Sequence, residues 1–206
     1  MKKKIFTLSF MLLSLAWTVQ AQHDVLVRFG LKTGFNMSKW GGDFADEFKT
    51  TFKPGFHIGG VAEMMLNERW SIQPELLLSY EGTSDESSEG ISAIYIKAPI
   101  LVSYNFYVGS GRLSPGVGIF CATGVAGKID GGENTFEHID RFDWGLEAKL
   151  SYELQNGVFI GAGFSQGFVD THCMSLKASI GYKFPYSKWL NSTYNRRSAL
   201  ENNYNE

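Results

Sequence analysis

Hydrophobic and polar residues alternate along most of the chain after residue 22, most clearly between residues 144 and 154. Trp144, Leu146 and Leu150 stand on one set of positions, and Glu147 and Lys149 stand on the other. A period of two is typical of a β-strand with one apolar and one polar face. The pattern recurs in eight segments, which are residues 27–38, 54–65, 69–81, 94–107, 113–126, 142–154, 158–168 and 174–184. It therefore predicts an all-β chain of eight strands.

The connections between these segments alternate in length. Short ones lie at residues 66–68, 108–112 and 155–157, and longer polar ones lie at 39–53, 82–93 and 128–141, with a shorter one at 169–173. This alternation predicts an antiparallel up-and-down meander whose two ends differ. Bacterial outer-membrane barrels have short periplasmic turns and longer extracellular loops. An even number of strands then leaves both termini on the periplasmic side.

The alternation alone does not say which face is inside, because a soluble lipocalin-type barrel alternates too, with its apolar face inward. Glycines favour the opposite arrangement. They stand on the polar positions at 30, 34, 59, 116, 118, 124, 145, 161, 163, 167 and 181. Glycines on a surface exposed to water would weaken the strands. In a narrow lumen they leave room for long neighbouring side chains.

The hairpin around residues 155–157 supports the same facing. A three-residue loop with Gly157 in the left-handed conformation places Tyr152 opposite Ile160 and Lys149 opposite Gly163. A two-residue turn would shift the register by one and exchange the faces. We prefer the longer loop because it pairs apolar residues with apolar residues, which places the glycines inside.

Aromatic residues on the apolar positions are predicted to form two bands. One band near the short turns contains Phe29, Trp70, Tyr104, Phe106, Tyr152, Tyr182 and Phe184, and the other contains Phe35, Phe56, Tyr80, Trp144 and Phe164. Two aromatic girdles around an aliphatic belt are typical of a barrel that crosses a membrane. The predicted fold is an eight-stranded antiparallel up-and-down transmembrane β-barrel over residues 22–184.

The polar positions carry charged residues of balanced sign, which predicts a structural charge network in the lumen. Its basic members are Arg28, Lys32, Lys97, Lys149, Lys177 and Lys183, and its acidic members are Glu63, Glu75, Glu81, Asp143, Glu147 and Glu153. An unpaired charge in such a confined interior would be costly, so these groups should pair. Eight strands enclose only enough space for side chains, so we expect a closed lumen.

The chain begins with features of a secretory signal peptide at residues 1–21. Three lysines precede an apolar run that is shorter than the ~20 residues needed to span a bilayer, and Ala21 ends a plausible cleavage site. Removal of these residues takes three of the 19 basic residues and none of the 21 acidic ones, so the formal net charge falls from −2 to −5. Such a charge does not favour nucleic-acid binding. Residues 185–206 are polar and are expected to form a disordered periplasmic tail.

Four short motifs resemble a known family. They are Gln73-Pro74-Glu75-Leu76, Tyr95-x-x-x-Pro99, Asp143-x-Gly145 and Gly181-Tyr182-Lys183-Phe184. In order and spacing they resemble the PorT-like outer-membrane β-barrels of Gram-negative bacteria. The resemblance implies an eight-stranded barrel that the outer-membrane assembly machinery inserts, with Phe184 as its terminal aromatic residue. The 22 residues after Phe184 depart from barrels that stop at this aromatic residue.

No set of residues predicts catalysis, a cofactor or a metal. His57 shares the polar positions of its strand, and we expect it to form hydrogen bonds in the lumen. The spacing of His138, Asp140, Asp170, His172 and Cys173 matches no compact zinc motif, so ordinary loop residues are expected there. Cys121 and Cys173 fall on opposite faces, which predicts two free thiols.

These observations favour a non-enzymatic outer-membrane barrel with a structural or binding role through its extracellular loops. Its expected partners are membrane lipid, lipopolysaccharide and the assembly machinery. One alternative is a soluble periplasmic or secreted lipocalin-like barrel that binds an apolar ligand. A second alternative is a membrane-embedded enzyme that modifies lipids.

Overall fold

The described part of the chain contains nine strands. The structure, a computed structural model, describes residues 26–41, 51–84, 90–129, 141–169 and 172–185. The strands are β1 (Leu26–Lys39), β2 (Thr51–Met65), β3 (Trp70–Ser84), β4 (Gly90–Tyr104), β5 (Phe106–Val108), β6 (Gly111–Ile129), β7 (Phe142–Leu154), β8 (Val158–Gly167) and β9 (Met174–Lys183). Within these ranges, no helix has the length and hydropathy needed to cross a membrane.

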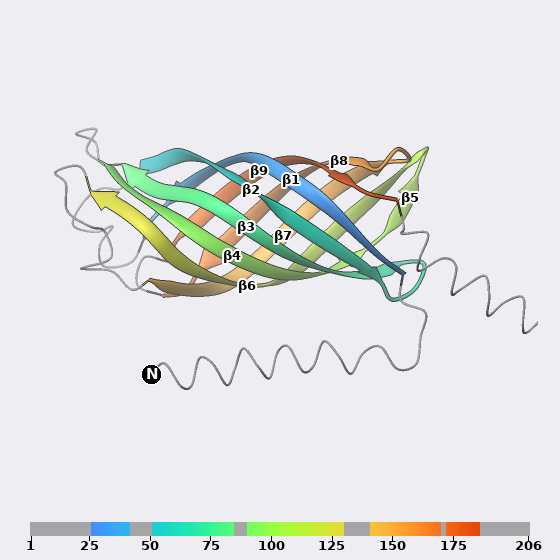
Figure 1. Cartoon of the computed structure of the whole chain (residues 1–206), viewed down its shortest axis with the longest axis horizontal. Helices are drawn as coiled ribbons and strands as arrows, with labels where there is room; N and C mark the ends of the chain where they lie inside the picture. The colour runs from blue at the N-terminus through green and yellow to red at the C-terminus, as the bar shows by residue number, and fades with distance from the viewer. Residues whose placement is uncertain (1–25, 42–50, 85–89, 130–140, 170–171, 186–206) are drawn as a thin grey trace, which may run out of the picture. The chain divides into compact units, whose positions relative to one another are not determined.

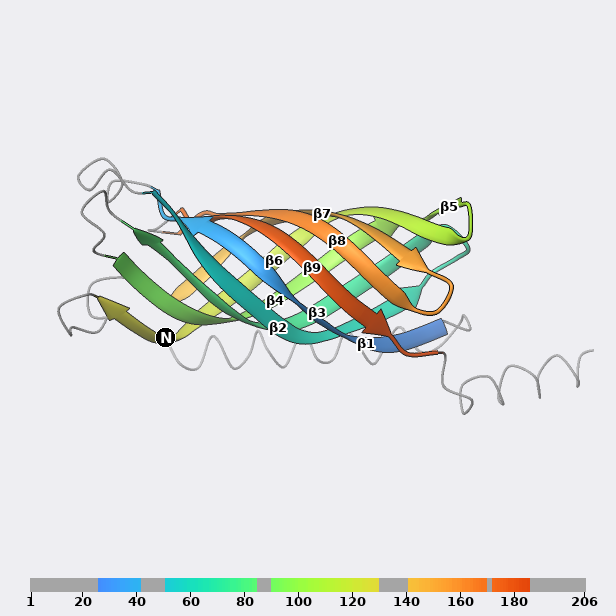
Figure 2. The same cartoon turned by 90° about the horizontal axis from the view of Figure 1, so that it is seen from above.

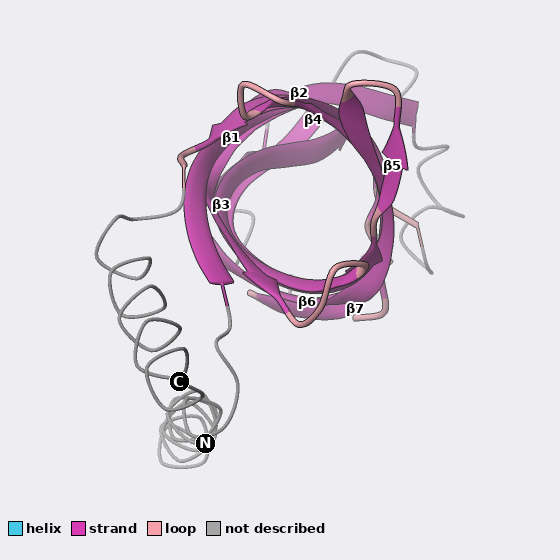
Figure 3. Cartoon of the chain, turned by 90° about the vertical axis from the view of Figure 1, so that its right-hand side faces the viewer, coloured by secondary structure: helices cyan, strands magenta, loops and turns pink. Residues whose placement is uncertain are grey.

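The strands form one antiparallel sheet that closes on itself (Figures 1 and 2). Neighbours in the sequence pair with each other, except that β4 pairs with β6 and not with β5. The sheet closes where β1 pairs with β9, from Gly30–Lys183 to Lys39–Met174. The view along the barrel shows an unbroken wall (Figure 3). The beginning of β1 and the end of β9 lie at the same side of the barrel as the short turns (Figure 1). The predicted antiparallel up-and-down barrel is confirmed.

The barrel has eight spanning strands because β4 and β5 are two parts of one strand. Ser103 pairs with Gly116 and Phe106 pairs with Leu113, so the register with β6 is unchanged across the interruption. At Asn105 the backbone N–H donates to the carbonyl oxygen of Arg69 at 2.6 Å, which continues the ladder with β3. The prediction of one membrane-spanning strand that includes residues 94–107 is therefore confirmed.

The hairpin between β7 and β8 has the predicted register. Tyr152 lies opposite Ile160 and Lys149 lies opposite Gly163. Gly157 has a φ of 87°, a conformation that glycine adopts without a steric cost, and its N–H donates to the carbonyl oxygen of Leu154 at 3.0 Å. The three-residue loop, and the facing of both strands that follows from it, are confirmed.

The apolar face of every long strand points outward. Phe35 is 78 % exposed and Val117 is 66 % exposed, whereas Glu63 and Lys97 on the other face are 1 % and 2 % exposed. A soluble barrel that carries an apolar ligand would have the reverse arrangement. The outward apolar surface therefore excludes the lipocalin-like alternative.

Aromatic rings touch each other on the outer face near both ends of the strands. Trp70 packs edge-on against Tyr104, with ring centroids 5.0 Å apart, next to the short turn that precedes β3. Phe56 stacks on Tyr80 at 5.7 Å near the long connections. Phe168, which the sequence pattern left out of the second band, packs against Trp144 at 5.2 Å.

Several glycines of the polar face are required by close backbone contact. A Cβ atom on Gly118 would collide with the carbonyl oxygen of Ile100, and one on Gly145 would collide with that of Gln166. The expected reason, room for long neighbours, applies at Gly163, where a Cβ atom would lie 3.9 Å from the Cβ atoms of Lys149 and Lys177. Glycine therefore allows close approach of the neighbouring backbone at some positions and leaves room for lumen side chains at others.

The ends of the chain lie outside the described residues. This applies to the predicted signal peptide 1–21 and to the predicted tail from residue 186 onward. The last strand ends at Lys183, and the N–H of Phe184 donates to the carbonyl oxygen of Phe29 at 2.8 Å. The end of the strand before Pro185 is as predicted, because proline has no N–H to donate.

The two cysteines are free and lie on opposite sides of the wall, as predicted. Cys121 is exposed on the outer face, and Cys173 is buried inside. We expect a membrane-permeant apolar maleimide to label Cys121 in the folded protein and to label Cys173 only after denaturation. Mass spectrometry of the wild-type protein and of Cys121→Ser checks this. Labelling of Cys173 in the folded barrel would show that its end is open.

Candidate functional site

The lumen is the candidate functional site because buried polar side chains line it. Strand alternation produces this lining. In β7, Asp143, Glu147 and Glu153 are buried, whereas Leu146 and Leu150 between them are exposed. A buried charge is stable only when it is paired and hydrogen-bonded, so the partners of these groups decide what the lumen can do.

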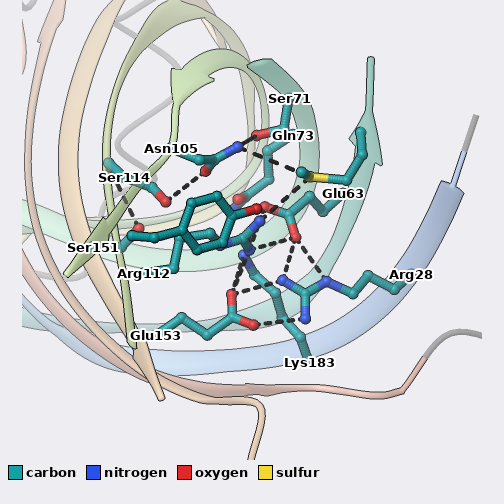
Figure 4. A network of polar contacts seen from close by, with 12 residues as sticks. Arg28, Glu63, Ser71, Gln73, Asn105, Arg112, Ser114, Ser151, Glu153 and Lys183 are labelled. Atoms are coloured by element: carbon teal, nitrogen blue, oxygen red, sulfur yellow. Dashed lines mark hydrogen bonds and ion pairs between the residues drawn. The ribbon is translucent and has the colours of Figure 1, made fainter. Parts of the chain in front are cut away.

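Five charged residues from five strands meet at the short-turn end and form what we call the mouth cluster: Arg28, Glu63, Arg112, Glu153 and Lys183 (Figure 4). Glu63 lies at its centre and accepts from Arg28 Nε at 2.8 Å, from Arg112 Nη2 at 2.8 and 2.9 Å, and from Lys183 Nζ at 3.1 Å. Glu153 accepts from Arg112 Nη2 at 2.6 Å and pairs with Arg28 and Lys183. The two carboxylates thus hold three cations.

Neutral polar groups continue the network next to the mouth cluster (Figure 4). Asn105 donates through Nδ2 to Ser71 Oγ at 3.3 Å and accepts from Ser114 Oγ at 2.7 Å. These contacts join β3, the β4–β5 strand and β6 across the inside of the wall.

The middle of the lumen contains two close ion pairs and one loose one. Lys177 donates to Glu147 Oε2 at 2.7 Å, and Lys32 donates to Glu75 Oε2. The ammonium group of Lys149 lies 3.9 Å from Glu75 Oε1, which is beyond hydrogen-bond distance.

An ion pair and a group of apolar side chains fill the end near the long connections. Lys97 donates to Glu81 Oε1 at 2.9 Å, and the thiol of Cys173 donates to Glu81 Oε2 at 3.4 Å. The apolar side chains, which we call the apolar cap, are Trp40, Ala93, Tyr95, Phe120, Ala122 and Cys173. Lys97 Nζ lies 4.4 Å from the centre of the Phe120 ring, within the range of a cation–π contact. The cap therefore contacts both members of the Lys97–Glu81 pair, through Phe120 and Cys173.

The structure brings most of the predicted lumen residues into ion pairs. These are Arg28, Lys32, Glu63, Glu75, Lys97, Glu147, Lys149, Glu153, Lys177 and Lys183, together with Glu81. Asp143 is different, because it accepts a hydrogen bond from the backbone N–H of Val169 at 3.2 Å, at the edge of the connection to β9.

Sequence reasoning missed one member of the mouth cluster and several apolar residues of the lumen. The sequence pattern places Arg112 in the short connection at residues 108–112, whereas β6 begins at Gly111. Leu77 and Leu101 are buried inside the barrel at 1 % and 0 % exposure. The spacing of Arg112 from Ser114 and Gly116 on the inner face was the signal that could have found it.

One histidine–serine pair occurs in the lumen, and its surroundings do not suit catalysis on a lipid. His57 Nε2 lies 2.9 Å from Ser179 Oγ, which agrees with the predicted hydrogen-bonding role of this histidine. Its Nδ1 atom has no hydrogen-bond partner, so no third group orients the ring. Ser179 lines a cavity of about 20 Å³, which is too small for a lipid.

The residues considered for zinc do not come together in the described part of the chain. Cys173 is buried against Glu81, and His172 is exposed beside it. His138, Asp140 and Asp170 lie outside the described residues. Among the residues that the structure describes, no three histidine, cysteine or acidic side chains form a group that could hold a metal ion.

A larger cavity opens at the mouth cluster. It has a volume of about 360 Å³, and Arg28, Met65, Tyr107, Arg112 and Glu153 are among the residues that line it. The smaller cavity of about 20 Å³ lies deeper, beside Lys149. The lumen is therefore accessible at the short-turn end and filled towards the long connections.

The profile of the family described as "outer membrane protein beta-barrel domain" matches residues 20–172, which is more than half of the chain. The chain belongs to this family. Its outward apolar face is then the surface that meets lipid, and the barrel resides in the outer membrane. A search of curated proteins found no match to this chain.

Solved structures of other outer-membrane barrels resemble this barrel. Ail, the attachment invasion locus protein of Yersinia pestis, is 13 % identical, with a TM-score of 0.44 over 77 % of this chain and 99 % of that one. Neisserial surface protein A is 15 % identical, with a TM-score of 0.48 over 76 % and 97 % of the two chains. The N-terminal barrel domain of OprF from Pseudomonas aeruginosa is 13 % identical, with a TM-score of 0.37 over 75 % and 97 %.

Proposed function

We propose that this outer-membrane barrel is not an enzyme and does not conduct, and that it serves as a rigid base for binding through its long connections. The observation that carries the proposal is the filling of the lumen. Ion pairs from the mouth cluster to Lys97–Glu81 cross the interior, and the apolar cap lies beyond them. A rigid barrel would hold the ends of the long connections at fixed distances from each other. Loops positioned in this way by a rigid scaffold often carry binding residues.

We propose further that the long connections face the exterior and that both termini are periplasmic. The turns at residues 66–69, 109–110 and 155–157 are short, and the connections at the opposite end are longer. This asymmetry is that of outer-membrane barrels with known orientation. Lipopolysaccharide would then surround the band around Phe56 and Tyr80, and the assembly machinery would recognise the strand that ends near Phe184.

The PorT-like branch of outer-membrane barrels is our proposal for the closer relationship. It rests on the four motifs named above, and in the structure their residues Glu75 and Lys183 form lumen ion pairs.

Purified protein in planar lipid bilayers should show no stable conductance. The physical reason is that paired charges and the apolar cap leave no continuous path for water. A general diffusion porin reconstituted in the same bilayers is the positive control. Reproducible ion-selective channels from the unaltered barrel would contradict the proposal and would indicate transport.

Epitope tags should report the proposed orientation in intact cells. A tag inserted between residues 85 and 89 should bind antibody without permeabilisation, and a tag after residue 206 should bind only after the outer membrane is permeabilised. A tag in the short turn at Gly109–Ser110 is the matched control for an insertion on the periplasmic side. The reverse labelling pattern would show that the long connections face the periplasm, and it would contradict the proposed binding role outside the cell.

A further inference from the structure

Lys149 is the one member of the charge network that lacks a close partner within the described residues. Glu75, its only ion-pair partner, lies 3.9 Å away and is already engaged by two other groups. Lys32 donates to one oxygen of Glu75, and Gln73 Nε2 donates to the other at 2.7 Å. The three N–H bonds of the Lys149 ammonium group therefore have no short acceptor, although its side chain is only 9 % exposed.

The surroundings of Lys149 carry an excess of positive charge. Four lysines and two glutamates line the cavity beside it: Lys32, Lys149, Lys177, Lys183, Glu75 and Glu147. Lys177 and Lys32 neutralise the two glutamates, and Lys183 is engaged with the mouth cluster. One uncompensated cation in a confined interior is costly, and a counter-ion would remove that cost.

The size of the cavity limits what such a counter-ion can be. Its volume is about 20 Å³, and a cavity of roughly 10–15 Å³ holds one water molecule. A single small monatomic ion fits this space, whereas phosphate or a carboxylate of a metabolite does not. Gly161 and Gly163 leave this room, because neither has a side chain to fill it.

Basic residues line both cavities and lie between them. Lys183 lines the small cavity and also pairs with Glu63 and Glu153 of the mouth cluster. Arg112 and Glu153 in turn line the cavity of about 360 Å³ at the short-turn end. An anion that enters at the short-turn end would pass cationic groups until it reached Lys149. The apolar cap would prevent it from moving further towards the long connections.

We propose that the lumen binds one small monovalent anion of the halide class at Lys149, in a dead-end site that is reached from the short-turn end. The anion completes the charge balance of the lumen and accepts hydrogen bonds from the Lys149 ammonium group. The site stabilises the closed barrel and does not make it a channel.

Crystals of the full mature protein grown in sodium bromide test the proposal directly. We expect an anomalous peak in the cavity, next to Lys149 Nζ. Ordered water there without an anomalous signal would overturn the proposal. This measurement needs no variant and does not depend on the orientation or the binding role proposed above.

Thermal unfolding in detergent gives the second test. The midpoint Tm of the unaltered protein should be higher in sodium chloride than in sodium gluconate at equal ionic strength, because gluconate is too large for the cavity. Lys149→Met, a neutral side chain of similar length, should lose this difference. Lys53→Met near the long connections is the matched control and should keep it. An equal Tm difference between the two salts in Lys149→Met would overturn the proposal. If this variant does not fold, the anomalous signal of bromide in the crystals is the deciding measurement.

Discussion

Glu63→Gln should lower the free energy of unfolding by about 3–5 kcal/mol, which is the usual cost of removing one partner from a buried charge network. Glu63 is 1 % exposed and holds Arg28, Arg112 and Lys183. Neutral glutamine leaves these three cations with Glu153 as their only close carboxylate in the mouth cluster. Urea unfolding of the barrel in lipid vesicles, followed by tryptophan fluorescence, measures the effect.

Glu68→Gln is the matched control, because Glu68 is exposed in the turn before β3. Surface changes of this kind are usually within about 0.5 kcal/mol of neutral. Adding Arg112→Met to Glu63→Gln should cost less than the sum of the two single changes, since it removes one of the cations left without a partner. Equal stabilities of Glu63→Gln and Glu68→Gln would show that the mouth cluster does not support the fold.

Gly163→Leu should destabilise the barrel by about 1–3 kcal/mol, the usual cost of forcing extra carbon atoms into a filled interior. The first added atom, Cβ, would lie 3.3 Å from the carbonyl oxygen of Ala148 and 3.9 Å from the Cβ atoms of Lys149 and Lys177. The rest of the side chain would have to enter a cavity of about 20 Å³. Yields of folded protein, judged by heat-modifiable gel mobility, and urea unfolding both report the change.

Ala162→Leu provides the comparison on the other face of the same strand. Ala162 is exposed on the outer wall and lies opposite Leu150. A leucine there adds apolar surface where the barrel meets lipid, so folding should be unaffected. If Ala162→Leu impaired folding and Gly163→Leu did not, the facing of β7 and β8 would be the reverse of the one described.

Local features of the sequence were enough to predict the strands and their facing. The period-two pattern is a property of single strands, and the outer or inner position of Leu150 and Lys149 follows from it. The loop at residues 155–157 has a length and a glycine that specify one register. The sequence could therefore predict the Lys149–Gly163 pairing before any long-range contact was known.

The pairing of the lumen charges could not be predicted from the same features. Arg28 and Glu153 are 125 positions apart and meet because β1 closes the barrel against β9. The stagger between all eight spanning strands sets the height of each side chain inside the lumen, and a single sequence does not reveal that stagger. For the same reason the equal numbers of acidic and basic residues suggested complete pairing, whereas Asp143 bonds to a backbone N–H and Arg112 joins the mouth cluster.

By itself the sequence thus determined an all-β barrel with a charged interior and an apolar exterior, because alternation and turn chemistry act over a few residues. Only the tertiary structure decided which charges neutralise each other, and that Trp40, Phe120 and Cys173 join in the apolar cap. It also decided that Lys149 is left with a loose partner. These outcomes depend on barrel closure, which brings together side chains from strands that are distant in the sequence.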